Sequence, residues 1–378
     1  MKNVKGEARH GNRRAISLFS GNTNDKINTL THRKFTDVEL FAGAGGLALG
    51  LEKAGFSGLE FVEINHDACN TLRMNRPKWN VIEGDIHAVD FSPLRGRVDV
   101  VSGGAPCQAF SYAGKRLGFG DTRGTLFAEF ARCVDEIRPK MFLFENVRGL
   151  LSHDKGRTFQ TIMHTFASQG YEIQYKVLNA CYFGVGQKRQ RLIVIGIRAD
   201  LVGRLCFEYP EPDARMTTLR EALKGVPDSP YQPYSENKRK VMELVPPGGC
   251  WVDLPDEVAR AYMGKSYFSG GGRRGMARRI SWDEPCLTLT TSPSQKQTER
   301  CHPDETRPFT VREYARIQSF PDDWSFTGSI SEQYKQIGNA VPVEMARRVG
   351  AQLIKALEGY EKILEAETKE ELCLELGH

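Results

Sequence analysis

Short apolar runs of strand length alternate along the chain with segments whose apolar residues have helical spacing. Strand-like runs that are apolar on both faces, separated by helical segments, are typical of a parallel sheet covered by helices. The runs predicted to be strands are 37–41, 59–65, 80–85, 98–104 and 141–146. Helices are predicted after the Gly-rich turn that follows residue 41, over 66–75 and over 125–137. The pattern therefore predicts an α/β fold with helices on both faces of the sheet.

The pattern changes twice further along the chain. Residues 171–180 alternate apolar and polar positions, and with 191–198 they predict an antiparallel pair at the edge of the sheet. Residues 200–305 contain eight prolines between positions 210 and 255 and few apolar runs longer than four residues. This composition predicts a separate and irregular module. Helical spacing returns at 309–320 and from Pro342, a suitable first-turn proline, to about 365.

Composition narrows the class of protein. The 378 residues are 40% hydrophobic and 26% charged, which indicates a folded globular protein and not a disordered or fibrous one. No apolar run approaches the ~18 residues of a membrane span, so we expect no contact with a membrane. The nine cysteines are scattered without a CxxC pair, which argues against disulfides and against a zinc or other metal site. We expect a protein of a reducing cytoplasm.

The net charge of +5 is unevenly distributed. Residues 1–34 carry eight Lys or Arg against two acids, and the segment from Arg260 to Arg279 carries six cations, several glycines and no acid. Basic segments with little Cβ bulk can follow a phosphate backbone closely. A solvated leader and a surface loop without a ligand are the plain alternatives for these two segments.

Three predicted strand ends carry residues typical of a nucleotide site. Phe41, Gly43 and Gly45 lie in a Gly-rich strand-to-helix turn, where glycines let the backbone approach a ligand. Glu63 ends the next strand, where an acid can bind the hydroxyls of a ribose, and Asp85 ends the third, where it can meet an adenine amino group. This arrangement fits either NAD or S-adenosylmethionine.

A cysteine and an acid follow the next two strands. Cys107 comes after the strand 98–104, between a proline and a polar loop, and Glu145 lies near the end of the strand 141–146. Neighbouring parallel strands bring their carboxyl ends to one crevice, so we expect the thiol and the carboxyl to lie together. Acyl transfer would need a histidine base, and none of the eight histidines lies at a strand end there.

These residues resemble the motifs of the DNA (cytosine-5)-methyltransferases of bacterial restriction–modification systems. Nine blocks stand in the family's order over 37–198 and 307–350, among them DVELFAGAGG, GGAPCQAFS, FLFENV, GQKRQR and QIGNAVP. The resemblance implies a Rossmann-like, S-adenosylmethionine-dependent methyltransferase sheet with a smaller, irregular, β-containing target-recognition domain. It implies a basic extension over 1–34, a catalytic domain over 35–200, a target-recognition domain over 201–325 and a C-terminal segment over 326–378 that returns beside the first helix.

The resemblance also implies a mechanism. Cytosine C5 is a weak nucleophile, so the Cys107 thiolate would first add to C6, while Glu145 contacts N3 and the exocyclic amine. Arg191 would pair with Glu145 and with the carbonyl of the base. Arg189 would steady the cysteine loop and phosphates, and Gln187 completes the Gln-x-Arg-x-Arg motif, for which a charged hairpin turn is the alternative. The base must be flipped out of the duplex.

The remaining site residues come from the same resemblance. The methyl-donor pocket would be lined by Phe41, Gly43, Gly45, Glu63, Ile64, Asp85, Ile86, Gly104, Pro106, Leu126, Asn339 and Val341. At position 64 the family often has a tryptophan against the adenine, and this chain has isoleucine. Contacts to DNA would come from Gln108, Ser111, Arg116, Arg273, Arg274, Arg278 and Arg279. Arginine is the residue that most often reads guanine in the major groove.

The partners implied are double-stranded DNA, bound by a monomer, and a restriction endonuclease of the same specificity. Three alternatives remain open on the residues. An RNA cytosine methyltransferase of similar fold would typically alter the Pro-Cys-Gln block, which is intact here. An NAD-dependent oxidoreductase would leave Cys107 and Glu145 without a role, and a silent DNA-binding regulator would be expected to have lost one of them.

Overall fold

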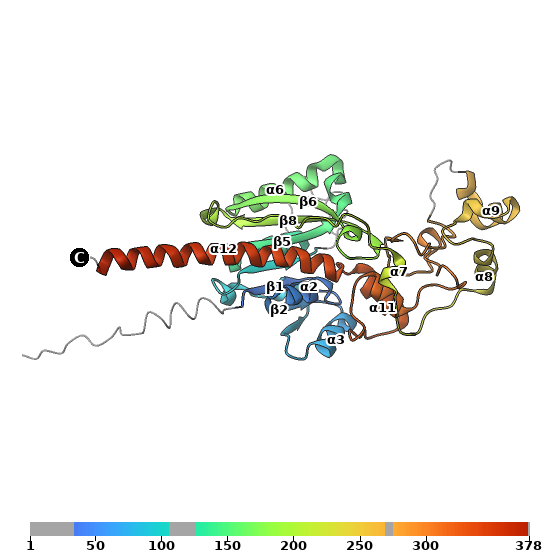
Figure 1. Cartoon of the computed structure of the whole chain (residues 1–378), viewed down its shortest axis with the longest axis horizontal. Coiled ribbons are helices and arrows are strands. Elements are labelled where there is room, and N and C mark those ends of the chain that lie inside the picture. Colours follow the sequence, from blue (N-terminus) through green and yellow to red (C-terminus); the bar gives the residue numbers. More distant parts are fainter. Residues whose placement is uncertain (1–33, 106–125, 269–274, 377–378) are drawn as a thin grey trace, which may run out of the picture. The chain divides into compact units, whose positions relative to one another are not determined.

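Seven strands form the central sheet in the order β3-β2-β1-β4-β5-β8-β6 (Figure 1). The computed structural model describes residues 34–105, 126–268 and 275–376, and Lys34–Ile363 fall into one compact unit that contains this sheet. The strands are β1 (Thr36–Leu40), β2 (Ser57–Glu63), β3 (Val81–Glu83), β4 (Val100–Gly103), β5 (Met141–Val147), β6 (Tyr171–Asn179) and β8 (Gln190–Arg198). A separate two-stranded sheet pairs β7 (Gln187–Lys188) with β9 (Cys286–Leu287).

The first five strands are parallel, and β8 runs antiparallel to both of its neighbours. The predicted α/β fold and the predicted antiparallel pair are therefore confirmed. The pair differs from the prediction in one respect, because β8 lies inside the sheet and β6 alone forms the edge. The register of β5 and β8 sets Glu145 opposite Ile193 and Val147 opposite Arg191.

Ten α-helices are described. They are α2 (Gly46–Ala54), α3 (His66–Asn75), α5 (Leu126–Ile137), α6 (Arg157–Ser168), α7 (Leu219–Ala222), α8 (Glu236–Glu243), α9 (Asp256–Met263), α10 (Val311–Ile317), α11 (Ile330–Asn339) and α12 (Val343–Leu376). The bounds of α3 are the predicted ones, and α12 begins directly after Pro342 as expected. Helices α6, α7, α8, α9 and α11 were not predicted. Within the described ranges, no helix combines the length and the apolar character needed to cross a bilayer.

Two apolar clusters hold the sheet and its helices together. One contains Val38 and Leu40 of β1 with phenyl rings of α5, β5 and α6, such as Phe130 and Phe144, whose centroids lie 5.1 Å apart edge to face. The other joins α2 to α10 and α11 through residues such as Tyr314, which is fully buried. Helix α10 lies within the predicted bounds of the target-recognition domain but packs into this second cluster.

A third and smaller cluster lies within residues 201–325. Its buried members are Met242, Val245, Leu254, Ala259, Ala277 and Cys301. The described residues of this segment form short helices and the two residues of β9, and the rest of them is irregular, as the prolines led us to expect.

The first helix and the last helix touch through small residues. A β-carbon at Gly50 of α2 would lie 2.4 Å from the Cβ of Ala346, and one at Gly350 would lie 2.8 Å from the Cβ of Ala54. Real side chains never approach so closely, so the two helix axes can meet at this distance only because both positions are glycine. The segment that follows α11 thus returns to α2.

Strand β1 carries two buried acids on the side opposite Val38 and Leu40. Asp37 and Glu39 are each 2% exposed, and Asp37 Oδ2 and Glu39 Oε2 have no hydrogen-bond partner among the described residues. Burial raises the pKa of Asp37 to about 7. Burial, helped by the nearby charges of Asp37 and Glu63, raises the pKa of Glu39 as well.

These acids predict a stability that falls as pH rises. The folded chain holds a proton on Asp37 up to about pH 7, whereas the unfolded chain releases it near the ordinary value of 3.8. Asp37 therefore contributes stability fully below about pH 4 and loses that contribution as pH rises to 7. We expect Asp37→Asn to remove part of this slope and to raise the free energy of unfolding at pH 8 by roughly 1–3 kcal/mol. Urea unfolding at pH 5 and pH 8 measures both effects.

The control is Asp228→Asn, which changes an exposed carboxyl of the same type. A slope that is identical in the wild type and in both variants would show that Asp37 is ionised in the folded chain.

Candidate active site

The carboxyl ends of β1, β2, β4 and β5 meet at one edge of the sheet, because these strands are parallel. Three residues after β1 have left-handed backbone angles: φ is 58° at Phe41, 53° at Gly43 and 83° at Gly45. A β-carbon at Gly45 would collide with Leu72 and Trp324, whereas Gly43 faces open space. The turn therefore presents bare backbone at Gly43, and Phe41 adopts a strained conformation that a non-glycine residue rarely takes.

Glu63 at the end of β2 braces this turn. Its carboxylate accepts hydrogen bonds from the backbone N–H groups of Gly43 at 2.8 Å, Ile64 at 2.9 Å and Asn65 at 2.7 Å. The side chain of Ile64 next to it is 69% exposed, which is unusual for isoleucine. An acid held by backbone donors beside a free aliphatic surface suits a ribose and an adenine ring, as the sequence led us to expect.

Asp85 lies one strand further, after β3, and is exposed. The backbone N–H and then the ring of His87 hold the pKa of Asp85 below its usual value. Ile86 differs from the prediction, because its side chain is 4% exposed and belongs to the core beside α5. Its side chain does not line an open pocket.

Two further parts of the predicted donor pocket come from distant segments. A β-carbon at Gly46 would lie 2.2 Å from the Val341 carbonyl oxygen, so the chain after α11 passes directly against the first turn of α2. Asn339, the last residue of α11, is exposed, and Leu126 begins α5 half-buried against the same apolar cluster as Phe41. The structure thus brings Val341 to the turn that contains Gly43 and Gly45.

Sequence reasoning missed Trp324 as part of this site. The indole Nε1–H donates to the Ala44 carbonyl oxygen at 3.2 Å, and the ring lies against Gly45. Trp324 is 1% exposed, so its ring supports the turn from the interior of the protein. Its only signal in the sequence is its place in the block that contains Pro321 and Asp322, which gives no role.

An acid and a guanidinium form an ion pair at the end of β5. Glu145 Oε1 lies 2.7 Å from Arg191 Nε, and both side chains are 11% exposed. A β-carbon at Gly104 would lie 2.6 Å from Glu145 Oε2, so only glycine leaves room for this carboxylate. The predicted partnership of Glu145 with Arg191 is present, and it lies where β4 ends.

The described chain before Cys107 ends at Ala105, next to the strand that carries Glu145. Asn146 Nδ2 donates to the Ala105 carbonyl oxygen at 3.0 Å, and Asn146 is 3% exposed. Pro106, Cys107, Gln108, Ser111 and Arg116 lie outside the described residues. The last described residue before them is therefore tied to the strand that carries Glu145.

Three other cysteines have buried thiols that are unsuited to the role expected of Cys107. Cys69, Cys133 and Cys181 are buried, as expected for small apolar side chains. Burial raises the pKa of Cys69 to about 12 and raises that of Cys133 and Cys181. These thiols are protonated at neutral pH and unsuited to nucleophilic attack.

The first two residues of the Gln-x-Arg-x-Arg motif lie inside the protein, although Arg189 was expected to steady the cysteine loop and phosphates. Gln187 is fully buried, and Arg189 is 2% exposed. Arg189 donates to the carbonyl oxygens of Leu289 at 3.0 Å and Gly338 at 2.9 Å, so it does not face a phosphate. Burial, together with the charge of Arg191, lowers the pKa of Arg189 to about 9.

Two of the predicted DNA-binding arginines are also internal. Arg279 is 4% exposed and donates to the oxygens of Met242, Val245, His302, Pro303 and Thr306. Arg278 donates to the Gly248 carbonyl oxygen at 2.7 Å and to Glu284 at 3.0 Å. The prediction that both arginines contact DNA is wrong for these conformations, and Arg273 and Arg274 lie outside the described residues.

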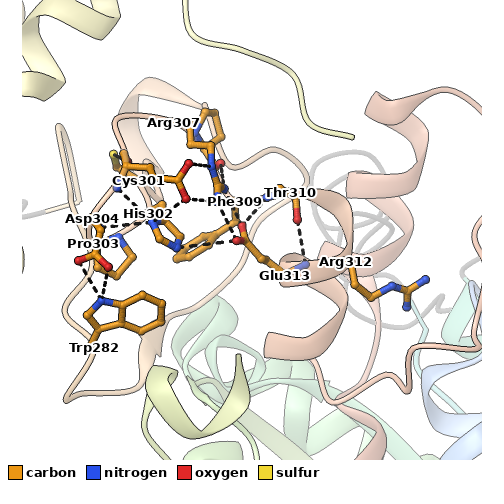
Figure 2. Close-up of polar contacts among 12 residues, drawn as sticks. Trp282, Cys301, His302, Pro303, Asp304, Arg307, Phe309, Thr310, Arg312 and Glu313 are labelled. Atoms are coloured by element: carbon orange, nitrogen blue, oxygen red, sulfur yellow. Dashed lines mark hydrogen bonds and ion pairs between the residues drawn. The ribbon is translucent and has the colours of Figure 1, made fainter. Parts of the chain in front are cut away.

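Two of the carbonyls that Arg279 binds, those of His302 and Pro303, belong to a polar cluster around His302 (Figure 2). His302 Nδ1 accepts the backbone N–H groups of Asp304 and Glu305, and its Nε2 faces Glu313 at 3.8 Å. Arg307 binds Glu313 through two hydrogen bonds of 2.8 and 2.9 Å. Burial lowers the pKa of His302. Both ring nitrogens of His302 face groups of the same cluster, and these contacts join the loop to α10. The cluster therefore has a structural role.

Comparison with known proteins agrees with this geometry. Residues 35–355 match the family described as C-5 cytosine-specific DNA methylase. The chain is 55% identical to the type II methyltransferase M.Sau96I of Staphylococcus aureus, over 88% of this chain and 79% of that protein. It is also 55% identical to M.Eco47II of Escherichia coli, over 88% of this chain and 82% of that protein.

The fold has a counterpart among solved structures. A crystal structure of an E. coli prophage protein, described as a DNA modification methyltransferase, aligns with a TM-score of 0.63 and 25% identity. The alignment covers 86% of this chain and 99% of that one. The matched residues include the sheet, the turn that contains Gly43 and Gly45, and the Glu145–Arg191 pair. The chain therefore belongs to the C-5 cytosine-specific DNA methylases and is a cytosine-5 DNA methyltransferase of the bacterial restriction–modification type.

Proposed function

We propose that this methyltransferase acts on a cytosine flipped out of double-stranded DNA, through a covalent bond between Cys107 and C6, with S-adenosylmethionine as methyl donor. The observation that carries the proposal is the Glu145–Arg191 ion pair at 2.7 Å, next to Gly104 and to the segment that leads to Cys107. The turn that contains Gly43 and Gly45, called the donor turn from here on, follows β1 at the same edge of the sheet. Strand β4 lies between β1 and β5, the strand that carries Glu145.

The residues at that turn fit the proposed donor. Gly43 leaves its space open, Glu63 is held where it can meet ribose hydroxyls, and Ile64 offers an exposed apolar surface for adenine. When bound, S-adenosylmethionine supplies a methyl group on a positively charged sulfur. Asn339 at the end of α11 and Val341 just after it line the other side of the site.

The chain's own residues activate the base in two ways. The Cys107 thiolate adds to C6, and the ring electrons move to C5, which can then take the methyl group. Glu145 contacts N3 and the exocyclic amine and supplies a proton that keeps negative charge from building on the ring. Arg191 holds Glu145 and binds the carbonyl of the base. Loss of the C5 proton afterwards expels the thiolate.

The burial of the ion pair supports base flipping. Glu145 and Arg191 are each only 11% exposed and lie at a strand end, so a base stacked within a duplex cannot reach them. Enzymes that modify a base commonly take it out of the stack for this reason.

We further propose that residues 201–325 recognise the target sequence, in a monomer whose host carries an endonuclease of the same specificity. The separate cluster that contains Met242 and Cys301 supports a module with its own small core. Its sequence is rich in arginine, the residue most often used to read guanine.

The proposal predicts methylation at one recurring DNA sequence. We expect bisulfite sequencing of mixed-sequence DNA, after incubation with the protein and S-adenosylmethionine, to show protected cytosines at a single short motif. The Cys107→Ser variant should give no protection, because a hydroxyl adds to C6 far more weakly, while it still binds donor and DNA. If Cys107→Ser still protected cytosines, Cys107 would not be the nucleophile. If the protein methylated RNA and not DNA, the proposed substrate would be wrong.

The ion pair predicts a second effect on activity. Glu145→Gln keeps the shape of the side chain but removes the acid, so we expect kcat to fall by roughly 10²–10⁴-fold. Donor affinity should stay within about twofold, because Glu145 does not line the donor turn. Single-turnover methylation and calorimetric titration with S-adenosylhomocysteine measure the two effects. A kcat near that of the wild type would exclude Glu145 as the proton donor.

The arginines of the target-recognition module predict two distinct phenotypes. Arg279→Ala removes the guanidinium donor from the buried carbonyl oxygens of Val245, His302 and Pro303, so we expect the free energy of unfolding to fall by roughly 3 kcal/mol or more. The double variant Arg273→Ala/Arg274→Ala should leave unfolding unchanged and weaken DNA binding, with a salt slope lower by about 1–2.

Chemical denaturation and DNA binding at several salt concentrations separate these outcomes. Equal stability of Arg279→Ala and the wild type would contradict the structural role of Arg279. An unchanged salt slope for the double variant would exclude Arg273 and Arg274 as phosphate contacts.

A further inference from the structure

Two buried side-chain amides meet between the target-recognition module and the donor site. Gln318 directly follows α10 and Gln187 belongs to β7, and both are fully buried. Gln187 Nε2 donates to Gln318 Oε1 at 2.9 Å. A buried amide with a satisfied donor and acceptor fixes its neighbours in one arrangement, because every shift leaves a polar group unpaired.

Gln318 holds the last turn of α11 and the residue after it. Its Nε2 donates to the carbonyl oxygens of Ile337 at 2.8 Å and Ala340 at 3.2 Å. These carbonyls flank Asn339 at the end of α11, where the Ile337 carbonyl also accepts the N–H of Ala340 at 3.2 Å. The backbone carbonyl of Gln318 also accepts the N–H of Val343, the first residue of α12. Gln318 therefore fixes the chain on both sides of Val341.

Gln187 and Arg189 hold the other side of this junction. Gln187 Oε1 accepts the backbone N–H of Leu289 at 2.8 Å, and Arg189 donates to the Leu289 carbonyl oxygen. Arg189 also donates to the carbonyl oxygen of Gly338, one residue before Asn339. The strand that leads to Arg191 is thus joined to the segment 337–341 by two separate side chains.

We infer that Gln318 is a positioning residue for the methyl-donor site. It sets the backbone around Asn339 and Val341 against the donor turn and keeps that backbone in register with the strand that carries Arg191. Only an amide can do this, because the position needs an acceptor for Gln187 and a donor for two carbonyls. The inference rests on the proposed use of S-adenosylmethionine.

The test is donor binding by Gln318→Met, which keeps the length of the side chain and removes its hydrogen bonds. We expect the dissociation constant of S-adenosylhomocysteine, titrated without DNA, to rise about 5–10-fold. The KM for S-adenosylmethionine should rise similarly, with kcat and the KM for DNA within about twofold. Gln187→Met, which removes one of the same bonds, should raise the dissociation constant less, and it serves if Gln318→Met does not fold.

The matched control is Gln336→Met. Gln336 is another buried glutamine, in the same helix as Asn339, but its amide binds Thr71 and the Thr327 carbonyl and has no contact with Gln187. We expect it to lower the melting temperature without changing donor affinity. An unchanged donor affinity in Gln318→Met, or an equal rise in Gln336→Met, would overturn the inference. If the wild type binds no S-adenosylhomocysteine, the proposed donor is wrong instead.

Discussion

The contact on which the active site depends is that of the Val341 carbonyl with the first turn of α2. The carbonyl oxygen occupies the space that a β-carbon at residue 46 would need, so any residue other than glycine there would push the two segments apart. Trp324 and Gly50 extend the same contact along the turn and along the helix. The donor turn is consequently shaped by residues from both ends of the described unit, and its open side at Gly43 is what remains for a ligand.

The direction of one strand has a similar importance for the reactive end of the site. Arg191 is the second residue of β8, and it reaches Glu145 near the end of β5 because β8 runs against the parallel strands. A parallel strand in that place would bring its last residues, not its first, to this edge. The reversal also lets the motif before β8 contact Leu289, Gln318 and Gly338 within a few residues. The Glu145–Arg191 pair, the segment around Leu289 and the end of α11 are therefore joined at one place.

The sequence was sufficient for the sheet and for the pairing of Glu145 with Arg191. Apolar strands with polar residues at their ends define an edge, and the family's motifs identify which acids lie there. The sequence did not show what the arginines bind, because an arginine next to glycines is compatible both with a contact to DNA and with contacts to backbone carbonyls. Arg279 and Arg189 were misplaced for this reason. Helix α11 was missed because only Tyr334 and Ile337 provide large buried apolar side chains.

The contact of Trp324 with Ala44 also bears on how the protein is made. The two residues lie 280 positions apart, so the donor turn leaves the ribosome long before the residues that shape it. A nascent chain that has completed the sheet still lacks Trp324, Gln318 and Val341, and so has no finished donor site. Any product that stops before Trp324 would lack the contacts that shape the turn after β1. Two fragments divided in that module would recover a complete site only by associating.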